Sequence, residues 1–189
     1  VRDRYEEIIE QSELYEESAA FPEKAEKHRQ KAKELQEKHR KSLDKDFLHE
    51  FQVAVDDATE DDLSDQRPFH WMLEFPSVYA DGGFDVIVGN PPWDVLSANR
   101  GEFFSRYDNK FRSYGPEEKD EREAELLEQD QISKAYERYQ RNFDLRAEYF
   151  NNSPDYHLQS STVAGNTMSR ENDLSVLFLE RIFSLTRDD

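Results

Sequence analysis

The sequence contains no cysteine, and its 189 residues include only six glycines, two methionines and ten lysines. Without cysteine the chain can form neither a disulfide nor a thiolate metal site, which is typical of a cytoplasmic protein. No apolar stretch approaches the roughly 18 residues that a membrane span requires. The first residues, VRDRYEEIIEQ, have the pattern of neither a signal peptide nor a transit peptide. We therefore expect a cytoplasmic protein that has no membrane partner.

Positive charge is scarce as well, since 43 acidic residues against 25 basic ones give a net charge of −18. Taken alone, this charge opposes binding to nucleic acid, which is itself a polyanion. Acidic surfaces and few lysines are also compatible with a salty cytoplasm, where ions screen the repulsion. We interpret the composition as that of a halophilic protein. The aromatic content of 13% argues against disorder.

The spacing of apolar residues predicts a helix-rich α/β protein. A short acidic helix is expected over residues 4–18, and a second helix from Pro22 to about Val55, because proline is well tolerated in a first helical turn. Residues 56–66, DDATEDDLSDQ, are expected to form a solvated acidic linker, and the aromatic-rich stretch that follows is expected to form a short strand or turns. The run FDVIV at 84–88 predicts a buried parallel strand.

The second half of the chain predicts more helix than sheet. Residues 94–115 are polar and irregular in pattern, and a long charged helix is expected from Pro116 to Phe150. Residues 151–170 are expected to form a loop, and NDLSVLFLERIFSL at 172–185 an amphipathic helix. We expect two parts, a helical, coiled-coil-like insertion over 1–66 and part of a catalytic domain over 67–189 that carries the charged segment 116–150.

The segment GNPPW directly after the predicted strand has the residue types needed to hold a planar amine. The side-chain oxygen of Asn90 can accept a hydrogen bond from an NH₂ group, and the carbonyl of Pro91 offers a second acceptor without a competing N–H. Pro92 stiffens the loop, and Trp93 can stack on a base that has left its helix. Ligands of open α/β sheets bind outside the carboxyl ends of strands, which is where this segment is predicted to lie.

On these residues, FDVIVGNPPW resembles motif IV, the [DNS]PP[YFW] loop of amino-group DNA methyltransferases that use S-adenosylmethionine. The preceding FHWMLEFPSVYADGGFD is similar to the corresponding region of large adenine-specific enzymes of the type IIG restriction–modification and phage-defence kind. The resemblance implies a partial Rossmann-like core and a site-specific, adenine-specific DNA methyltransferase. It implies that Asn90 and Pro91 bind the N6 amine of a flipped adenine in double-stranded DNA, with Pro92 stiffening the loop and Trp93 stacking on the base.

The family's glycine-rich FxGxG turn for the cofactor is missing, because none of the six glycines makes that pattern. We therefore expect the chain to be an internal fragment of such an enzyme, inactive alone, with its cofactor-binding residues and target-recognition region elsewhere. No metal site is expected, since the five histidines are scattered along the chain. The oligomeric state and the recognition sequence are not specified by these patterns.

Two other functions fit the same residues. An N-P-P-aromatic loop also serves methyltransferases that act on an RNA base or a glutamine amide, and the loop could instead be a structural turn in a non-catalytic helical interaction module. A buried, backbone-bonded Asn90 would favour the structural turn.

A local basic island, PEKAEKHRQKAKELQEKHRKSLDK, contains seven of the ten lysines. It is interpreted as a charge-laced helix that pairs with the acidic helix over 4–18 or with the acidic stretch 117–130, in preference to a DNA-backbone contact, because acids are interleaved throughout.

Overall fold

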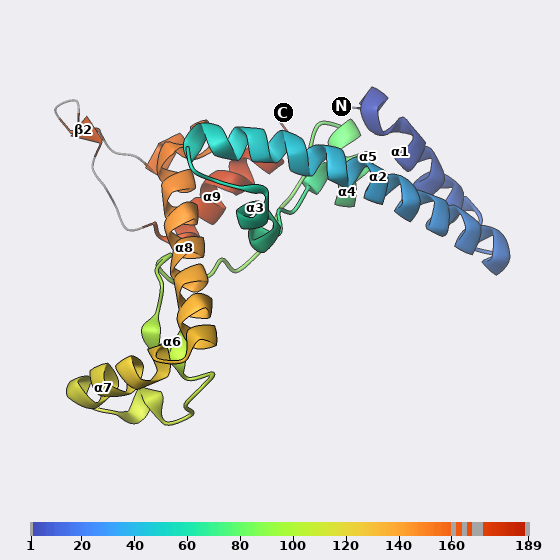
Figure 1. Cartoon of the computed structure of the whole chain (residues 1–189). Helices are drawn as coiled ribbons and strands as arrows, with labels where there is room; N and C mark the ends of the chain where they lie inside the picture. The colour runs from blue at the N-terminus through green and yellow to red at the C-terminus, as the bar shows by residue number, and fades with distance from the viewer. Residues whose placement is uncertain (1, 160–161, 164–165, 168–171, 188–189) are drawn as a thin grey trace. The chain divides into compact units, whose positions relative to one another are not determined.

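The computed structural model describes residues 2–159, 162–163, 166–167 and 172–187, and these residues are mostly helical (Figure 1). They divide into two compact units, Val1–Pro91 with Phe178–Asp189, and Pro92–Leu177. The boundaries fall between the two prolines of the NPPW motif and within the last helix. No helix in the described part of the chain is both long and apolar enough to cross a membrane.

The first unit begins with two helices that pack side by side, α1 (Arg2–Glu17) and α2 (Pro22–Ala54) (Figure 1). Pro22 lies in the first turn of α2, as predicted. The helices bury Ile8, Leu35 and Leu43 together with Leu73. Of the two acidic partners predicted for the basic helix, the one found is therefore the helix at 4–18, and His28 Nδ1 lies 2.9 Å from Gln11 Oε1 across the pair.

Residues 60–66 form helix α3 (Glu60–Gln66), so the predicted acidic linker is wrong over this stretch. Thr59 accepts a hydrogen bond from the backbone N–H of Asp62, and the Asp62 carboxylate accepts one from the N–H of Thr59 at 3.0 Å. This reciprocal cap satisfies two backbone donors that a helix start otherwise leaves unpaired. Leu63 supplies the apolar contact, being only 6% exposed.

The aromatic stretch that follows forms two short helices, α4 (Trp71–Glu74) and α5 (Pro76–Ala80), where a strand or turns were expected. The rings of Phe69, Trp71, Phe75 and Phe84 pack against one another with centroids 4.9–6.0 Å apart. These contacts hold the beginning of the 84–88 segment against α4 and α5.

The second unit is built around an aromatic core. Its helices are α6 (Arg100–Phe104), η1 (Phe111–Ser113), α7 (Pro116–Leu127), α8 (Asp130–Asn152) and η2 (Pro154–Gln159). Phe103, Phe104 and Phe111 are buried with Leu126 and Ile132. The segment predicted to be irregular, 94–115, thus supplies three of the five buried core residues.

The single helix predicted from Pro116 to Phe150 is broken after Leu127. Leu126 and Ile132 are both buried in the same cluster. In one straight helix, at roughly 100° per residue, a separation of six positions would place them on different faces. The turn at residues 128–129 lets both side chains reach the core.

Sheet structure in the described part of the chain is limited to a hairpin of β1 (Thr162–Val163) and β2 (Asn166–Thr167), with Thr162 opposite Thr167. In the predicted loop over 151–170, residues 154–159 form η2, and residues 160–161, 164–165 and 168–170 lie outside the described residues. The helix-rich part of the fold prediction is confirmed. The prediction of a buried strand over 84–88 is wrong in its burial, since Val86 is 73% exposed and Val88 is 91% exposed. Among the described residues the segment has one parallel bridge, between Phe84 and Thr186, and the next partner in that register, residue 188, lies outside the described residues.

The chain's last helix, α9 (Leu174–Leu185), matches the predicted amphipathic helix. Leu177 and Leu185 are each 3% exposed. Phe178, which the spacing places on the same apolar face, is 50% exposed. Leu179 and Phe183 are also exposed, at 52% and 64%. The helix therefore buries a narrower stripe than the sequence suggested.

Candidate amine-binding loop

Residues 85–94 form a segment outside the helices and strands, and its N-terminal end is anchored by backbone hydrogen bonds. The N–H of Phe84 donates to the carbonyl of Leu185 at 2.9 Å, and the N–H of Arg187 donates to the carbonyl of Phe84 at 3.2 Å. Asp85 also forms an ion pair with Arg187. The chain thus enters the NPPW motif from a fixed point beside the residues that follow α9.

Gly83 makes this close approach possible. Its φ of +129° lies in the region that favours glycine, and a Cβ at this position would lie 2.7 Å from the carbonyl oxygen of Leu185. The backbone nitrogen of Arg187 would be 2.9 Å away. Any side chain at residue 83 would therefore push the two backbones apart.

The C-terminal end of the segment is anchored within the second unit. The N–H of Leu174 donates to the carbonyl of Asp94 at 3.0 Å, and the N–H of Leu96 donates to the carbonyl of Asn172 at 2.8 Å. Asp173 accepts hydrogen bonds from the hydroxyl and the backbone N–H of Ser175 at the start of α9, and these bonds hold the pKa of its carboxyl below the ordinary value.

The four motif residues between these anchors are largely open to solvent. Trp93 is 77% exposed, Asn90 and Pro92 are exposed, and Pro91 is half-buried. Within the part of the chain that the structure describes, neither the Asn90 amide nor the Trp93 indole has a hydrogen-bond partner. The side-chain oxygen of Asn90 and the face of Trp93 are therefore accessible to a ligand.

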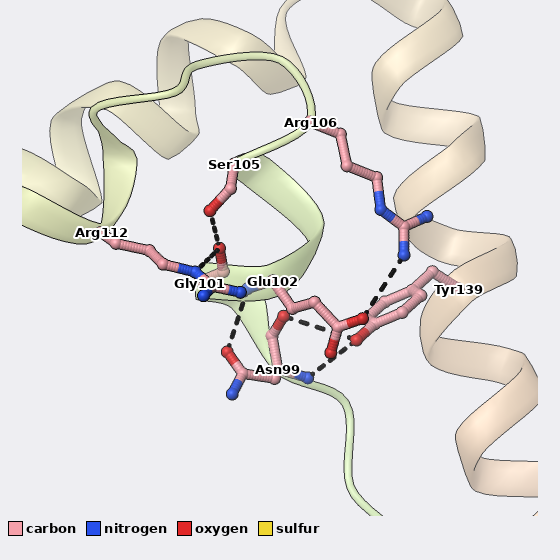
Figure 2. A network of polar contacts seen from close by, with 7 residues as sticks. All are labelled: Asn99, Gly101, Glu102, Ser105, Arg106, Arg112 and Tyr139. Carbon is pink, nitrogen blue, oxygen red and sulfur yellow. Dashed lines mark hydrogen bonds and ion pairs between the residues drawn. The ribbon is translucent and has the colours of Figure 1, made fainter.

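A polar network fixes the chain soon after the motif, in the second unit (Figure 2). The Asn99 side chain accepts from the N–H of Glu102 at 3.1 Å and caps α6. The N–H of Asn99 donates to the hydroxyl of Tyr139 on α8, also at 3.1 Å. Arg106 reaches the same place, with its guanidinium 5.9 Å from the centre of the Tyr139 ring and its ion pair to Glu102 at 3.6 Å.

The other side of α6 is tied down by the backbone of Gly101. Its carbonyl accepts from the hydroxyl of Ser105 and, at 3.5 Å, from Nε of Arg112 (Figure 2). The loop that leaves the motif therefore ends on a rigid support, whose role sequence reasoning missed. The signal that could have revealed it is the short N-x-x-E pattern at 99–102, which is typical of a helix start.

The glycines of the described residues do not form the glycine-rich turn that the resemblance would require for the cofactor. Gly82 and Gly83 are the only adjacent glycines in the sequence, and the space above Gly83 is filled by the 185–187 backbone. Gly89 has open space around it but no neighbouring glycine. Within the described part of the chain, no three histidine, aspartate or glutamate side chains gather as metal ligands.

Comparisons with known proteins converge on one family. Residues 8–150 match the sequence profile described as Eco57I restriction-modification methylase, and this range includes the NPPW motif. A protein of Methanocaldococcus jannaschii, described as a putative type II restriction enzyme and methyltransferase, is 44% identical over 43 residues. That match covers 22% of this chain and 4% of the length of the archaeal protein. No solved structure matches the chain at a significant level.

Proposed function

Since the chain belongs to the Eco57I restriction-modification methylase family, we propose that residues 90–93 are the amine-binding loop of a site-specific DNA methyltransferase. The acceptor is the N6 amine of an adenine that has been flipped out of double-stranded DNA. Restriction–modification or phage defence is the biological setting that fits this activity. The proposed donor is S-adenosylmethionine, as the methylase family implies.

One observation carries the proposal: the Asn90 amide is exposed and has no hydrogen-bond partner among the described residues, and Trp93, three residues later in the sequence, is exposed as well. An asparagine that only stabilised a turn would bond to its own backbone, and this one has no such bond in the described chain. The amide oxygen of Asn90 and the carbonyl of Pro91 would accept the two N6 protons. With both protons engaged, the nitrogen lone pair is directed towards the methyl donor, while Trp93 stacks on the adenine ring.

In this proposal, the residues of this chain bind the amine and the base of the acceptor, and they do not bind the methyl donor. The glycine-rich turn that would hold the donor is absent from the sequence, so the part proposed for this chain in the reaction is to bind and orient the acceptor. We propose that residues 1–66 are a helical insertion and 67–189 part of the catalytic domain, in which the bridge between Phe84 and Thr186 begins a partial Rossmann-like sheet. The donor pocket and the target-recognition region would then belong to other parts of a longer polypeptide, and the chain alone would be inactive.

The proposal is tested by transfer of a labelled methyl group to duplex DNA by the complete polypeptide that contains this chain. We expect Asn90→Ala to lower the rate at least about 100-fold, because the amine is no longer oriented. Asn90→Asp should keep most of the activity, since the motif admits aspartate. Trp93→Phe should likewise keep most of the activity, because phenylalanine can still stack on the base, whereas Trp93→Ala should lose activity. Helical circular dichroism controls for folding and should be unchanged, because both positions are exposed.

Full activity of Asn90→Ala would contradict the catalytic assignment. If the label is found on RNA or on a glutamine amide and not on DNA, the loop binds an amine as proposed, but the substrate is not DNA. A polypeptide with no methyl transfer to any of these acceptors would favour the non-catalytic interaction module.

A further inference from the structure

A pocket far along the sequence from the NPPW motif lies wholly within the first unit. It has a volume of about 670 Å³ and is lined by the second half of α2, by α3 and by the residues 67–69 that follow α3. Figure 1 shows α3 beside this half of α2. A cavity of this size falls within the range of small-ligand sites, roughly 300–1,000 Å³.

The pocket is basic in a strongly acidic chain. Four cationic side chains line it, namely Arg40, Lys41, Lys45 and Arg67, against two carboxylates, Asp44 and Glu60. The chain as a whole carries a net charge of −18. The local excess of positive charge comes from the basic island of α2 together with Arg67.

Three of the four cationic side chains of the pocket are available to bind an anion, because they are not paired with neighbouring groups that the structure describes. Arg40 forms an ion pair with Glu74 at 2.6 Å, and the Asp44 carboxylate is bonded to Nε2 of His70 at 2.7 Å. The side chains of Lys41, Lys45 and Arg67, by contrast, have no ion pair or hydrogen bond with any residue that the structure describes. These three side chains can bind an anion without first breaking an ion pair.

Arg67 is held in an unusual backbone conformation. Its φ of +49° places it in the left-handed region at the C-terminal cap of α3, where glycine or asparagine is favoured. A non-glycine residue in this region is strained. Glycine at this position would therefore remove both the strain and the side-chain charge.

An exposed aromatic ring lies next to these charges. Phe69 lines the pocket and is 55% exposed, with its ring edge-on to Trp71 at 4.9 Å between centroids. Cations beside an open aromatic face are the combination by which proteins bind nucleotides, since phosphate pairs with the cations and the base stacks on the ring.

We propose that this pocket binds a nucleotide unit, with its phosphate held by Lys41, Lys45 and Arg67 and its base against Phe69. The unit belongs either to a DNA strand or to a free nucleotide, since both present the same phosphate and ring. The site does not depend on the proposed methyl transfer, because none of its lining residues belongs to the NPPW motif.

The test is calorimetric titration of the 189-residue chain at low salt with three probes, a single-stranded DNA oligonucleotide, adenosine monophosphate and inorganic phosphate. We expect Arg67→Gly to weaken nucleotide binding about tenfold, the effect of losing one charge-assisted hydrogen bond. The unfolding temperature of this variant should stay equal or rise, because glycine relieves the strain at φ +49°. Lost binding therefore cannot be attributed to lost folding.

Lys38→Gln is the matched control, since it removes one charge from α2 outside the pocket. It should change the affinity less than about twofold. Phe69→Ala should weaken the oligonucleotide and the mononucleotide but not inorganic phosphate. Tighter binding of the oligonucleotide identifies a DNA strand as the source, and equal binding of the mononucleotide identifies a free nucleotide.

Unchanged affinity in Arg67→Gly, or an equal loss in Lys38→Gln, would overturn the site. Binding of all three probes that is insensitive to Phe69→Ala would overturn the nucleotide assignment. Asn90→Ala should leave these affinities unchanged whether or not it abolishes methylation, so failure of this proposal and failure of the methyltransferase proposal are distinguishable.

Discussion

Two neighbouring stretches rich in large apolar residues differ sharply in exposure. In the segment 86–93, Val86 is 73% exposed, Val88 is 91% exposed and Trp93 is 77% exposed. In the segment 103–111, Phe103, Phe104 and Phe111 are at most 2% exposed. The second stretch packs against residues of helices α7 and α8, whereas Val86, Val88 and Trp93 of the first stretch remain largely exposed. Burial therefore separates side chains that build the fold from side chains that are available for binding.

The largest effect on the free energy of unfolding should come from replacing one aromatic residue of each stretch by alanine. Phe104→Ala should lower the free energy of unfolding by about 3–5 kcal/mol, because it leaves a cavity in a closed aromatic core. Trp93→Ala should change it by no more than about 0.5 kcal/mol. Thermal unfolding followed by circular dichroism measures both. Equal destabilisation by the two variants would show that Trp93 is a core residue.

A second pair of variants compares two glycines on either side of the predicted strand. Gly83→Ala should destabilise the chain by about 1–3 kcal/mol, since it combines a φ of +129° with a 2.7 Å approach to the Leu185 carbonyl. Gly89→Ala should be close to neutral, because nothing lies within 4 Å of the added Cβ. Denaturant unfolding measures the difference. A neutral Gly83→Ala would mean that residues 185–187 do not fix the start of the segment.

The smallest effect should appear on acidification, in the buried stretch only. Hydrogen bonds from Arg122 and from the backbone N–H of Lys110 lower the pKa of Asp108 beside Phe111. A lowered folded-state pKa gives stability that is present above the ordinary aspartate value of about 3.9 and is lost as the pH falls through the folded-state pKa. Asp108→Asn should flatten this part of the pH–stability profile. A profile with the same slope in the variant would assign the acid sensitivity to other carboxylates.

Local signals in the sequence predicted what depends on local structure. Pro22 and the regular apolar spacing after it were sufficient to predict the helix that ends at Ala54. The capping pair Thr59 and Asp62 is equally local, and the abundance of acids in DDATEDDLSDQ masked it. The NPPW motif could be identified from the sequence because its residue types are chemically specific, and this specificity does not depend on the fold.

Features that depend on distant contacts could not be predicted in this way. An apolar run of five residues is compatible with a strand, but only pairing partners elsewhere in the chain decide whether the ladder forms, and the described chain offers one at Phe84 alone. The basic island was expected to be neutralised by its own acids. Which lysines stay unpaired, such as Lys41 and Lys45, depends on where Glu74 and His70 lie after folding.

The backbone between Phe84 and Asp94 has a further consequence for the behaviour of the chain in solution. Its N–H and C=O groups at 86–90 have no backbone partner in the described chain, and Val86 and Val88 within this range are largely exposed, which makes this segment a template for β-pairing between molecules. A net charge of −18 opposes such contact by colloidal repulsion. Added salt shortens the range of this repulsion to about 10 Å at 0.1 M. The ionic strength of the buffer should therefore set the concentration at which the purified chain begins to self-associate.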